Sequence, residues 1–227
     1  MKTRLSQRGV QLTEIGLGAA QFGNLYRVTS DDEVHLAVRQ AWQDGIRYFD
    51  TAPHYGLGLS ERRLGRELAS RPRGEFVVST KVGRLLQPSP ETAHLQDGGG
   101  FVVPASSRRV WDFSRDGILR SVESSLERLG LDYLDIAYLH DPDDFWVEAS
   151  TTGIATLIEL RDQGVVRSIG AGMNQSAMLR TPDMVRKSLR RQRWVWPQAA
   201  GRDRCQVTGL GGGEVLAQLA AGVRHES

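Results

Sequence analysis

The sequence predicts an α/β fold built on a parallel sheet, of the barrel type. Short apolar runs alternate with segments of helical periodicity, and five such strand–helix units fill about 175 residues. A doubly wound sheet and a barrel both fit this alternation. The glycine-rich phosphate pattern typical of doubly wound dinucleotide folds is missing, because "GLGAAQFG" lacks the third glycine in place and "GLGGGE" follows no strand. The barrel is favoured by polar residues that close strands at their C-terminal ends, namely Asp50, Lys81, His140 and Asn174.

The first two units carry clear start signals. Residues 15–18 are the expected first strand. The serine and glutamate of "SDDE" form a capping box ahead of an apolar stripe, which predicts a helix over 31–44. The apolar run "IRYFDTA" is the expected second strand, 46–52, and a short helix is expected over 60–69.

The later units are interrupted once. The run "EFVVSTKVG" predicts a third strand over 75–83, and a Pro/Gly/Ser-rich stretch over 84–113 then breaks the alternation. Between Ser114, the expected cap, and Gly130, the expected stop, apolar side chains repeat at helical spacing. The remaining expected elements are two strands and the helix between them: 131–140, 154–163 and 165–174.

Composition and charge are those of an ordinary soluble globular protein. The chain of 227 residues is 40% apolar and 25% charged, with a net charge of +2. Residues 1–185 carry 21 Lys and Arg against 24 Asp and Glu, so the positive excess lies in the last 42 residues. There, "RKSLRRQRWVWPQAAGRDRC" favours a solvated tail over a patch that binds nucleic acid. We therefore expect no nucleic-acid partner.

The expected location is the cytoplasm. Cys205 is the single cysteine, which excludes an intrachain disulfide framework and fits a reducing compartment. The N-terminal residues have no apolar core of signal-peptide length. No run approaches the roughly 18 apolar residues of a membrane span, so we expect no membrane association.

Four residues near the strand ends suggest proton-transfer chemistry. A tyrosine with its ordinary pKa near about 10 exchanges protons poorly at neutral pH. An ammonium within hydrogen-bonding reach favours the phenolate, and a carboxylate behind the ammonium keeps it charged and in place. Tyr55, Lys81 and Asp50 would supply these groups, and His140 would orient the substrate oxygen. Reduction of a carbonyl also needs a hydride, which no side chain supplies, so the chemistry requires a nicotinamide cofactor.

Each of these residues alone also has a structural interpretation. Tyr55 is typical of a packed rim residue and Asp50 of a turn anchor. Lys81 also fits a solvated charge, and His140 a structural histidine. The sequence leaves open whether the four side chains converge.

Several stretches resemble the aldo-keto reductases, a family of (β/α)8 TIM barrels that use NAD(P)H. They are "YFDTAPHYGLGLSERRLGREL", "FVVSTKVGRLL", "SLERLGLDYLDIAYLHDPDD" and "VVRSIGAGMNQ". Within the family, "HDPDD" and "VWDFSRDGILRSVESSLERLG" resemble the aldose 1-dehydrogenase branch, which includes L-fucose/D-threo-aldose, L-galactose and pyridoxal dehydrogenases. The resemblance runs from Leu5 to about Met178.

The resemblance implies roles for particular residues. It implies Tyr55 as the general acid/base, Lys81 and Asp50 as its tuners, and His140 as the group that orients the carbonyl. The cofactor would be NADP or NAD, and the substrate an aldose or an aldehyde such as pyridoxal, with hydride transfer at C1 of the sugar. The implied cofactor-binding residues are Asp50, Asn174, Gly18 and Gln21. The family usually has Ser-Asn where this chain has Met173 and Asn174.

Two further sets of residues have alternative interpretations. Trp111 and Phe113, in the long loop, either wall the sugar site or pack in the core. The acidic residues of "HDPDD" resemble a metal site, but carboxylates so close together favour a solvated or loop-holding role, and the family needs no metal.

The resemblance ends near Thr181, which suggests an incomplete barrel of about five to six βα units followed by an atypical tail. Units of about 35 residues extrapolate to roughly 280 for a closed eight-unit barrel. We expect residues 1–180 to form a partial barrel domain. Residues 181–227 are basic and glycine-rich, as in a disordered or frameshift-derived segment. An open sheet edge would offer a route to self-association.

Two other functions remain as alternatives to the oxidoreductase. A barrel with Lys81 at a strand end also suits a Schiff-base aldolase. The second alternative is that the chain is an inactive, truncated remnant or an interaction domain.

Overall fold

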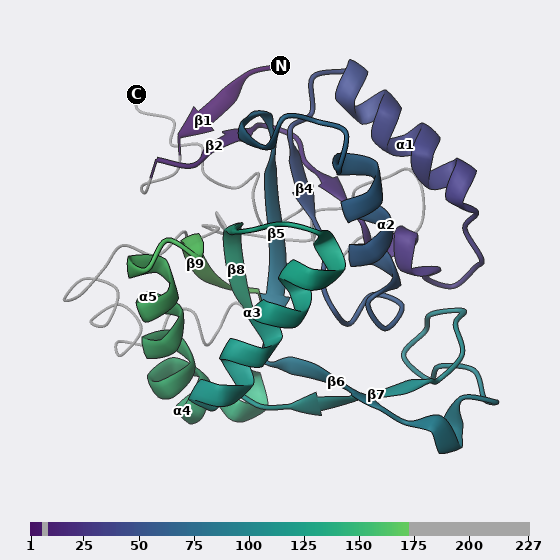
Figure 1. Cartoon of the computed structure of the whole chain (residues 1–227), viewed down its shortest axis with the longest axis vertical. Helices are drawn as coiled ribbons and strands as arrows, with labels where there is room; N and C mark the ends of the chain where they lie inside the picture. The colour runs from purple at the N-terminus through teal and green to yellow at the C-terminus, as the bar shows by residue number, and fades with distance from the viewer. Residues whose placement is uncertain (6–8, 173–227) are drawn as a thin grey trace, which may run out of the picture.

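The computed structural model describes residues 1–5 and 9–172 of the chain (Figure 1). Its central sheet has five strands in the order β3-β4-β5-β8-β9, and every neighbouring pair is parallel. The C-terminal ends of these strands therefore lie at one end of the sheet. The strands are β3 (Leu17–Gly18), β4 (Tyr48–Asp50), β5 (Val77–Val82), β8 (Leu134–His140) and β9 (Val166–Gly172). The predicted α/β fold with a parallel sheet is confirmed.

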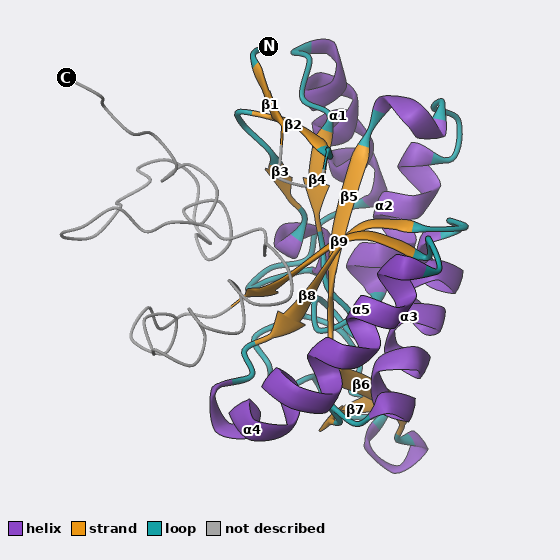
Figure 2. Ribbon diagram, turned by 90° about the vertical axis from the view of Figure 1, so that its left-hand side faces the viewer, coloured by secondary structure: helices purple, strands orange, loops and turns teal. Residues whose placement is uncertain are grey.

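The main helices cover one side of the sheet, as Figure 2 shows. The α-helices are α1 (Asp31–Gln43), α2 (Leu59–Leu68), α3 (Arg115–Leu129), α4 (Trp146–Glu148) and α5 (Ile154–Asp162). The capping box predicted for α1 is present, with Ser30 and Glu33 each accepting from the other's backbone N–H. Gly130 ends α3 in the left-handed conformation. Short turns of other helix types are η1 (Ala20–Gly23), η2 (Arg73–Glu75), η3 (Pro90–Thr92), η4 (Asp143–Phe145) and η5 (Ala149–Gly153).

The two faces of the sheet pack against different partners. Apolar side chains from α1, α2, α3 and α5 bury the helix-side face, together with Phe49, Val78 and Ala137 of the strands. On the other face, Tyr48 and Tyr138 pack in a smaller cluster that includes Val10, Val77 and Ile136. The alternation of strand side chains between two apolar environments explains why these strands are mostly apolar.

Two antiparallel hairpins were not predicted. The first joins β1 (Thr3–Leu5) and β2 (Gln11–Thr13), whose side chains are mostly exposed, so the sequence has no apolar alternation to reveal it. The second joins β6 (Arg84–Pro88) and β7 (Ser107–Trp111) within the stretch that interrupts the strand–helix rhythm. Its two ends pair as a ribbon that projects from the sheet in Figure 1, whereas residues 89–106 between them hold the short turn η3 and no strand.

A buried ion pair fixes α2, which directly follows the loop carrying Tyr55. The Glu61 carboxylate has no exposed surface and accepts from Arg128 Nε of α3 at 2.6 Å and from Thr80 Oγ1 of β5 at 2.7 Å. At Gly65, a side chain would collide with the backbone of Leu129, so α2 and α3 approach closely there. These contacts place the start of α2 firmly against the sheet.

Some predictions fall outside the described residues. Asn174 and the segment 181–227 lie there, so the division at residue 180 stays a prediction. Among residues 1–5 and 9–172, no helix combines the length and apolar character needed to cross a membrane.

Candidate active site

Lys81 joins the predicted side chains into one cluster. Its ammonium nitrogen donates to Asp50 Oδ2 at 2.8 Å, to the Tyr55 hydroxyl oxygen at 2.9 Å and to the Thr51 carbonyl at 3.1 Å. These three bonds use all the hydrogens of an ammonium group. The arrangement follows from the sheet order, because β4 and β5 are neighbours and Tyr55 lies in the loop that leaves β4.

The cluster is almost closed to water. Asp50 is 1% exposed, and Lys81 and Tyr55 are each 5% exposed. Burial alone would lower the pKa of Lys81, but the Asp50 carboxylate and the Tyr55 hydroxyl raise it above its usual value. Lys81 is therefore an ammonium at any physiological pH, and it stabilises negative charge on the Tyr55 oxygen.

A second buried hydroxyl holds the other oxygen of Asp50. Ser79 Oγ donates to Asp50 Oδ1 at 2.5 Å and lies 2.8 Å from the Tyr48 hydroxyl. Because an ionised carboxylate only accepts, the Ser79 hydrogen points to Asp50 and Tyr48 donates to Ser79. Burial, together with Tyr138 and Asp50, holds the pKa of Tyr48 well above its usual value, so Tyr48 stays a neutral donor. Both oxygens of the buried carboxylate are thus paired.

His140, the last residue of β8, lies beside Tyr55. The two ring centroids are 6.3 Å apart, and the His140 side chain is 6% exposed. Burial first, then the Lys81 ammonium, holds the pKa of His140 well below its usual value. Its ring is therefore neutral at physiological pH, and it is suited to hydrogen-bonding an uncharged substrate oxygen.

A contact between two glycines shapes the loop that carries Tyr55. Gly56 has φ of 62°, and a side chain there would collide with the carbonyl of Gly23. A side chain on Gly23 would in turn lie 2.5 Å from the Tyr55 carbonyl carbon. Only glycine permits this approach. The glycines in "QFG" and "HYG" therefore fix where the backbone of Tyr55 sits.

The β6–β7 excursion, by which we mean residues 84–111, contributes an aromatic neighbour of Tyr55 that the sequence did not reveal. Phe101, from the segment between the two strands, has its ring centroid 6.0 Å from that of Tyr55 and 5.2 Å from that of His54. Arg109 of β7 donates to the His54 carbonyl at 3.0 Å and is paired with Asp97. His54 also lies 5.6 Å from His140, ring centre to ring centre. Burial, followed by Arg109, lowers the pKa of His54 to about 3.

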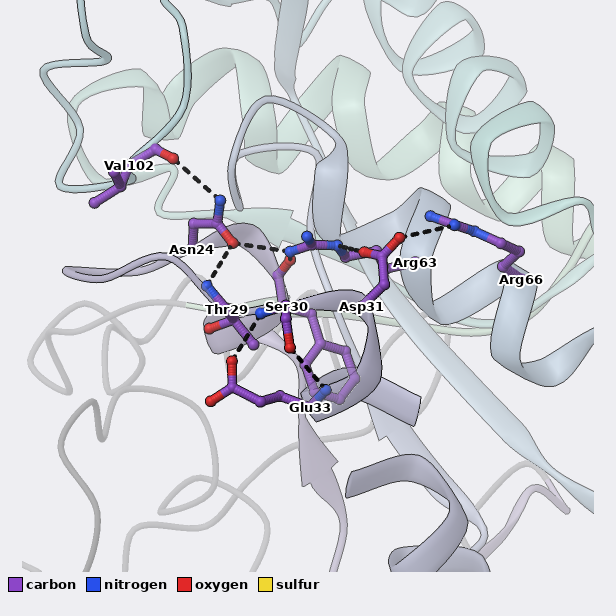
Figure 3. Close-up of polar contacts among 9 residues, drawn as sticks. Asn24, Thr29, Ser30, Asp31, Glu33, Arg63, Arg66 and Val102 are labelled. Carbon is purple, nitrogen blue, oxygen red and sulfur yellow. Dashed lines mark hydrogen bonds and ion pairs between the residues drawn. The ribbon is translucent and has the colours of Figure 1, made fainter. Parts of the chain in front are cut away.

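Asn24 holds this excursion against the helical layer, as Figure 3 shows. Its amide donates to the Val102 carbonyl at 3.1 Å, and its oxygen accepts from Thr29 N and from Arg63 Nη1 of α2. Arg63 also pairs with Asp31 at the start of α1. The residue next to Phe101 is thereby tied to two helices.

The other predicted site residues each have different contacts. Phe113 is fully buried, and its ring stacks on Trp111 at 5.8 Å, so the structure places Phe113 in the helix-side core. Trp111 is half-buried beneath the guanidinium of Arg84, 4.1 Å from its ring centroid. Gly18 lies opposite Asp50 in the sheet register. Gln21 donates its amide to Leu25 O and Thr29 Oγ1.

The acidic "HDPDD" segment does not gather ligands. Asp141 pairs with Arg84 at 2.7 Å, whereas Asp144 is exposed. No group of three or more His, Cys, Asp or Glu side chains within the described residues is arranged to hold a metal ion.

The donor set is suited to proton exchange with a carbonyl or alcohol oxygen. A phenol backed by an ammonium supplies or removes one proton, and a neutral imidazole binds the same oxygen. No described side chain can carry a hydride, so this chemistry is complete only with a redox cofactor.

Comparison with known proteins identifies the family. The sequence model of the Aldo/keto reductase family matches residues 14–182, well over half of the chain. The chain belongs to this family. The family resemblance seen in the sequence is thereby confirmed.

Individual aldo-keto reductase relatives agree with this assignment. D-threo-aldose 1-dehydrogenase from Pseudomonas sp is 51% identical over 72% of this chain and 51% of its own length. Pyridoxal 4-dehydrogenase from Microbacterium luteolum is 36% identical over 79% of this chain and 57% of its own length. The holo form of an aldo-keto reductase from Bacillus halodurans superposes with a TM-score of 0.63 at 26% identity, over 86% of this chain and 56% of that one. The chain spans about half the length of the relatives it matches.

Proposed function

We propose that the protein is an NAD(P)-dependent oxidoreductase that transfers a hydride between the nicotinamide and C1 of an aldose, or an aldehyde such as pyridoxal. One observation carries the proposal. Lys81 donates to the Tyr55 hydroxyl at 2.9 Å while it is paired with Asp50 at 2.8 Å. Two relatives, an aldose 1-dehydrogenase and a pyridoxal 4-dehydrogenase, support the substrate class.

Tyr55 would act as the proton carrier in both directions. In aldehyde reduction it donates its hydroxyl proton to the carbonyl oxygen, and Lys81 stabilises the phenolate that remains. In sugar oxidation the phenolate takes the proton from the C1 hydroxyl as a lactone forms. The bound nicotinamide supplies or accepts the hydride in these reactions. Asp50 keeps the ammonium charged and in position.

His140 would set the orientation of the reacting oxygen. Its neutral ring lies 6.3 Å from that of Tyr55, centroid to centroid, which supports a role for both groups at one substrate oxygen. Two donors on one oxygen polarise a carbonyl and fix the face that receives the hydride. Asp50 and Asn174 are the proposed contacts to the cofactor, together with Gly18 and Gln21, and the cofactor is NADP or NAD.

The structure favours this function over a Schiff-base aldolase. An aldolase lysine must lose its proton to attack a carbonyl. The Nζ of Lys81 instead donates three hydrogen bonds, and its pairing with Asp50 raises its pKa. Borohydride trapping of an aldehyde on Lys81 would reverse this preference.

We expect the purified chain to change the near-ultraviolet absorbance of the nicotinamide only when substrate is present. Aldoses with NADP or NAD, and pyridoxal with the reduced cofactors, make a suitable panel. A chain that neither binds NADPH in a fluorescence titration nor turns over any of these substrates supports the alternative of an inactive remnant or interaction domain. Size-exclusion chromatography on the same sample tests the predicted self-association.

A further inference from the structure

Asp141, which directly follows His140, has an unusual backbone conformation. Its φ is 39°, in the left-handed region that few residues other than glycine adopt, although Asp is among the more tolerant ones. Its N–H donates to the Gly172 carbonyl at 2.8 Å, which fixes this backbone between the ends of β8 and β9. The conformation brings Asp141 Oδ2 to 3.7 Å from His140 Nε2. Strained residues of this kind cluster at functional sites.

Arg84 holds the Asp141 carboxylate. Its Nη2 donates to Asp141 Oδ2 at 2.7 Å, and its guanidinium lies over the ring of Trp111. The side chains of Arg84 and Asp141 are only 15% and 27% exposed, so their charges are less screened than those of a surface pair. Trp111 therefore supports the Arg84 guanidinium through a cation–π contact.

The His140 ring carries its hydrogen on Nε2. Nδ1 is buried and has no hydrogen-bond partner among the described residues. Proteins rarely bury an N–H without an acceptor, and they tolerate an unpaired acceptor more often. The neutral ring therefore keeps Nδ1 as the acceptor. Asp141 Oδ2 lies 3.7 Å from Nε2, which is too long for a hydrogen bond.

We propose that Arg84 is a positioning residue for His140. It holds the Asp141 carboxylate beyond hydrogen-bonding reach of Nε2 and offsets its negative charge, so that an uncharged Nε2–H is presented to the substrate oxygen. Without Arg84, a small rotation of the carboxylate captures that hydrogen and favours the imidazolium. The effect on substrate rests on the proposed function, whereas the charge state of His140 does not.

Several charged or titratable groups face His140 from the elements packed around it. They are Lys81 of β5, Tyr55 and His54 of the loop after β4, Arg84 of β6, Arg109 of β7, and Asp141. Burial, then Lys81 and Arg84, lowers the pKa of His140. Asp141 is the carboxylate of this set, and Arg84 is the cation bonded to it.

The proposal is tested by NMR of ¹⁵N-labelled histidine on the full chain as a function of pH. The variants are Arg84→Gln, Asp141→Asn and the double variant, with Arg108→Gln as the matched control, because Arg108 is an exposed arginine of the same hairpin. We expect Arg84→Gln to raise the proton affinity of His140 by about 10- to 100-fold, because the nearby Asp141 carboxylate loses the positive charge of the arginine bonded to it. The double variant should lose most of this rise, because only the direct effect of the missing Arg84 charge remains, and the control should keep the wild-type value.

Two results would overturn the assignment. One is an unchanged His140 titration in Arg84→Gln, and the other is a rise in the double variant that is as large as in Arg84→Gln alone. In turnover assays, Arg84→Gln should lose activity selectively on the acid side of the pH profile. If no variant transfers a hydride at all, the proposed function fails, while the NMR comparison still decides the role of Arg84.

Discussion

Replacing Tyr55 with phenylalanine is expected to lower turnover by about 10²- to 10⁴-fold, the usual contribution of a positioned general acid or base. The phenylalanine ring keeps the packing against Phe101 and His140, whose centroids lie 6.0 and 6.3 Å away. Only the hydroxyl that accepts from Lys81 is lost. The loss should therefore fall on kcat, measured with saturating cofactor and substrate.

Two controls separate this loss from a structural effect. Tyr26→Phe removes a hydroxyl from a tyrosine that is 75% exposed, and it should leave turnover unchanged. NADPH fluorescence should report the same affinity for the wild-type chain and Tyr55→Phe. A Tyr55→Phe variant that turns over at the wild-type rate would remove Tyr55 from the mechanism.

Replacing Lys81 with methionine is expected to abolish turnover and to destabilise the fold by about 3–5 kcal/mol. The methionine leaves the Asp50 carboxylate buried, at 1% exposure, without its counter-charge. Because the pKa of Lys81 is raised in the folded state, its stabilising contribution is fully present below the unfolded pKa of 10.5 and is lost only as pH rises through the folded pKa. Urea unfolding at neutral pH therefore measures the whole effect.

The double variant Lys81→Met/Asp50→Asn distinguishes charge burial from packing. It leaves neither charge of the Lys81–Asp50 pair buried, so most of the lost stability should return, while turnover stays lost. Lys2→Met, at an exposed lysine, is the matched control and should unfold like the wild type. If the double variant is as unstable as Lys81→Met alone, packing rather than the buried charge explains the loss.

The sequence predicted the strands of the central sheet, the main helices and the strand-end residues because these depend on local patterns. The serine cap and glutamate of α1, the glycine stop of α3 and the apolar runs of β5 and β8 are each readable within a few residues. Parallel pairing then places Asp50, Lys81 and His140 at one end of the sheet. The sequence left open whether the side chains meet, and the structure brings Asp50 and Tyr55 to Lys81, with Nζ 2.8 Å from Asp50 Oδ2 and 2.9 Å from the Tyr55 hydroxyl oxygen.

The β6–β7 excursion could not be predicted in the same way. Its ribbon depends on contacts between distant segments, such as Asn24 with Val102 and Arg109 with His54. No spacing in the sequence indicates that Phe101 will pack on Tyr55. Similarly, nothing local distinguishes Trp111, beneath Arg84, from Phe113, which enters the core.

Deuterium transfer tests the central claim most directly. The full chain is incubated with NADP or NAD and an aldose labelled with deuterium at C1, and the nicotinamide is examined by mass spectrometry for wild type and Tyr55→Phe. We expect the label on the reduced nicotinamide in the wild type and at most a trace in Tyr55→Phe, with cofactor binding equal in both. Label released to water, or transfer at the same rate without the Tyr55 hydroxyl, would contradict the account.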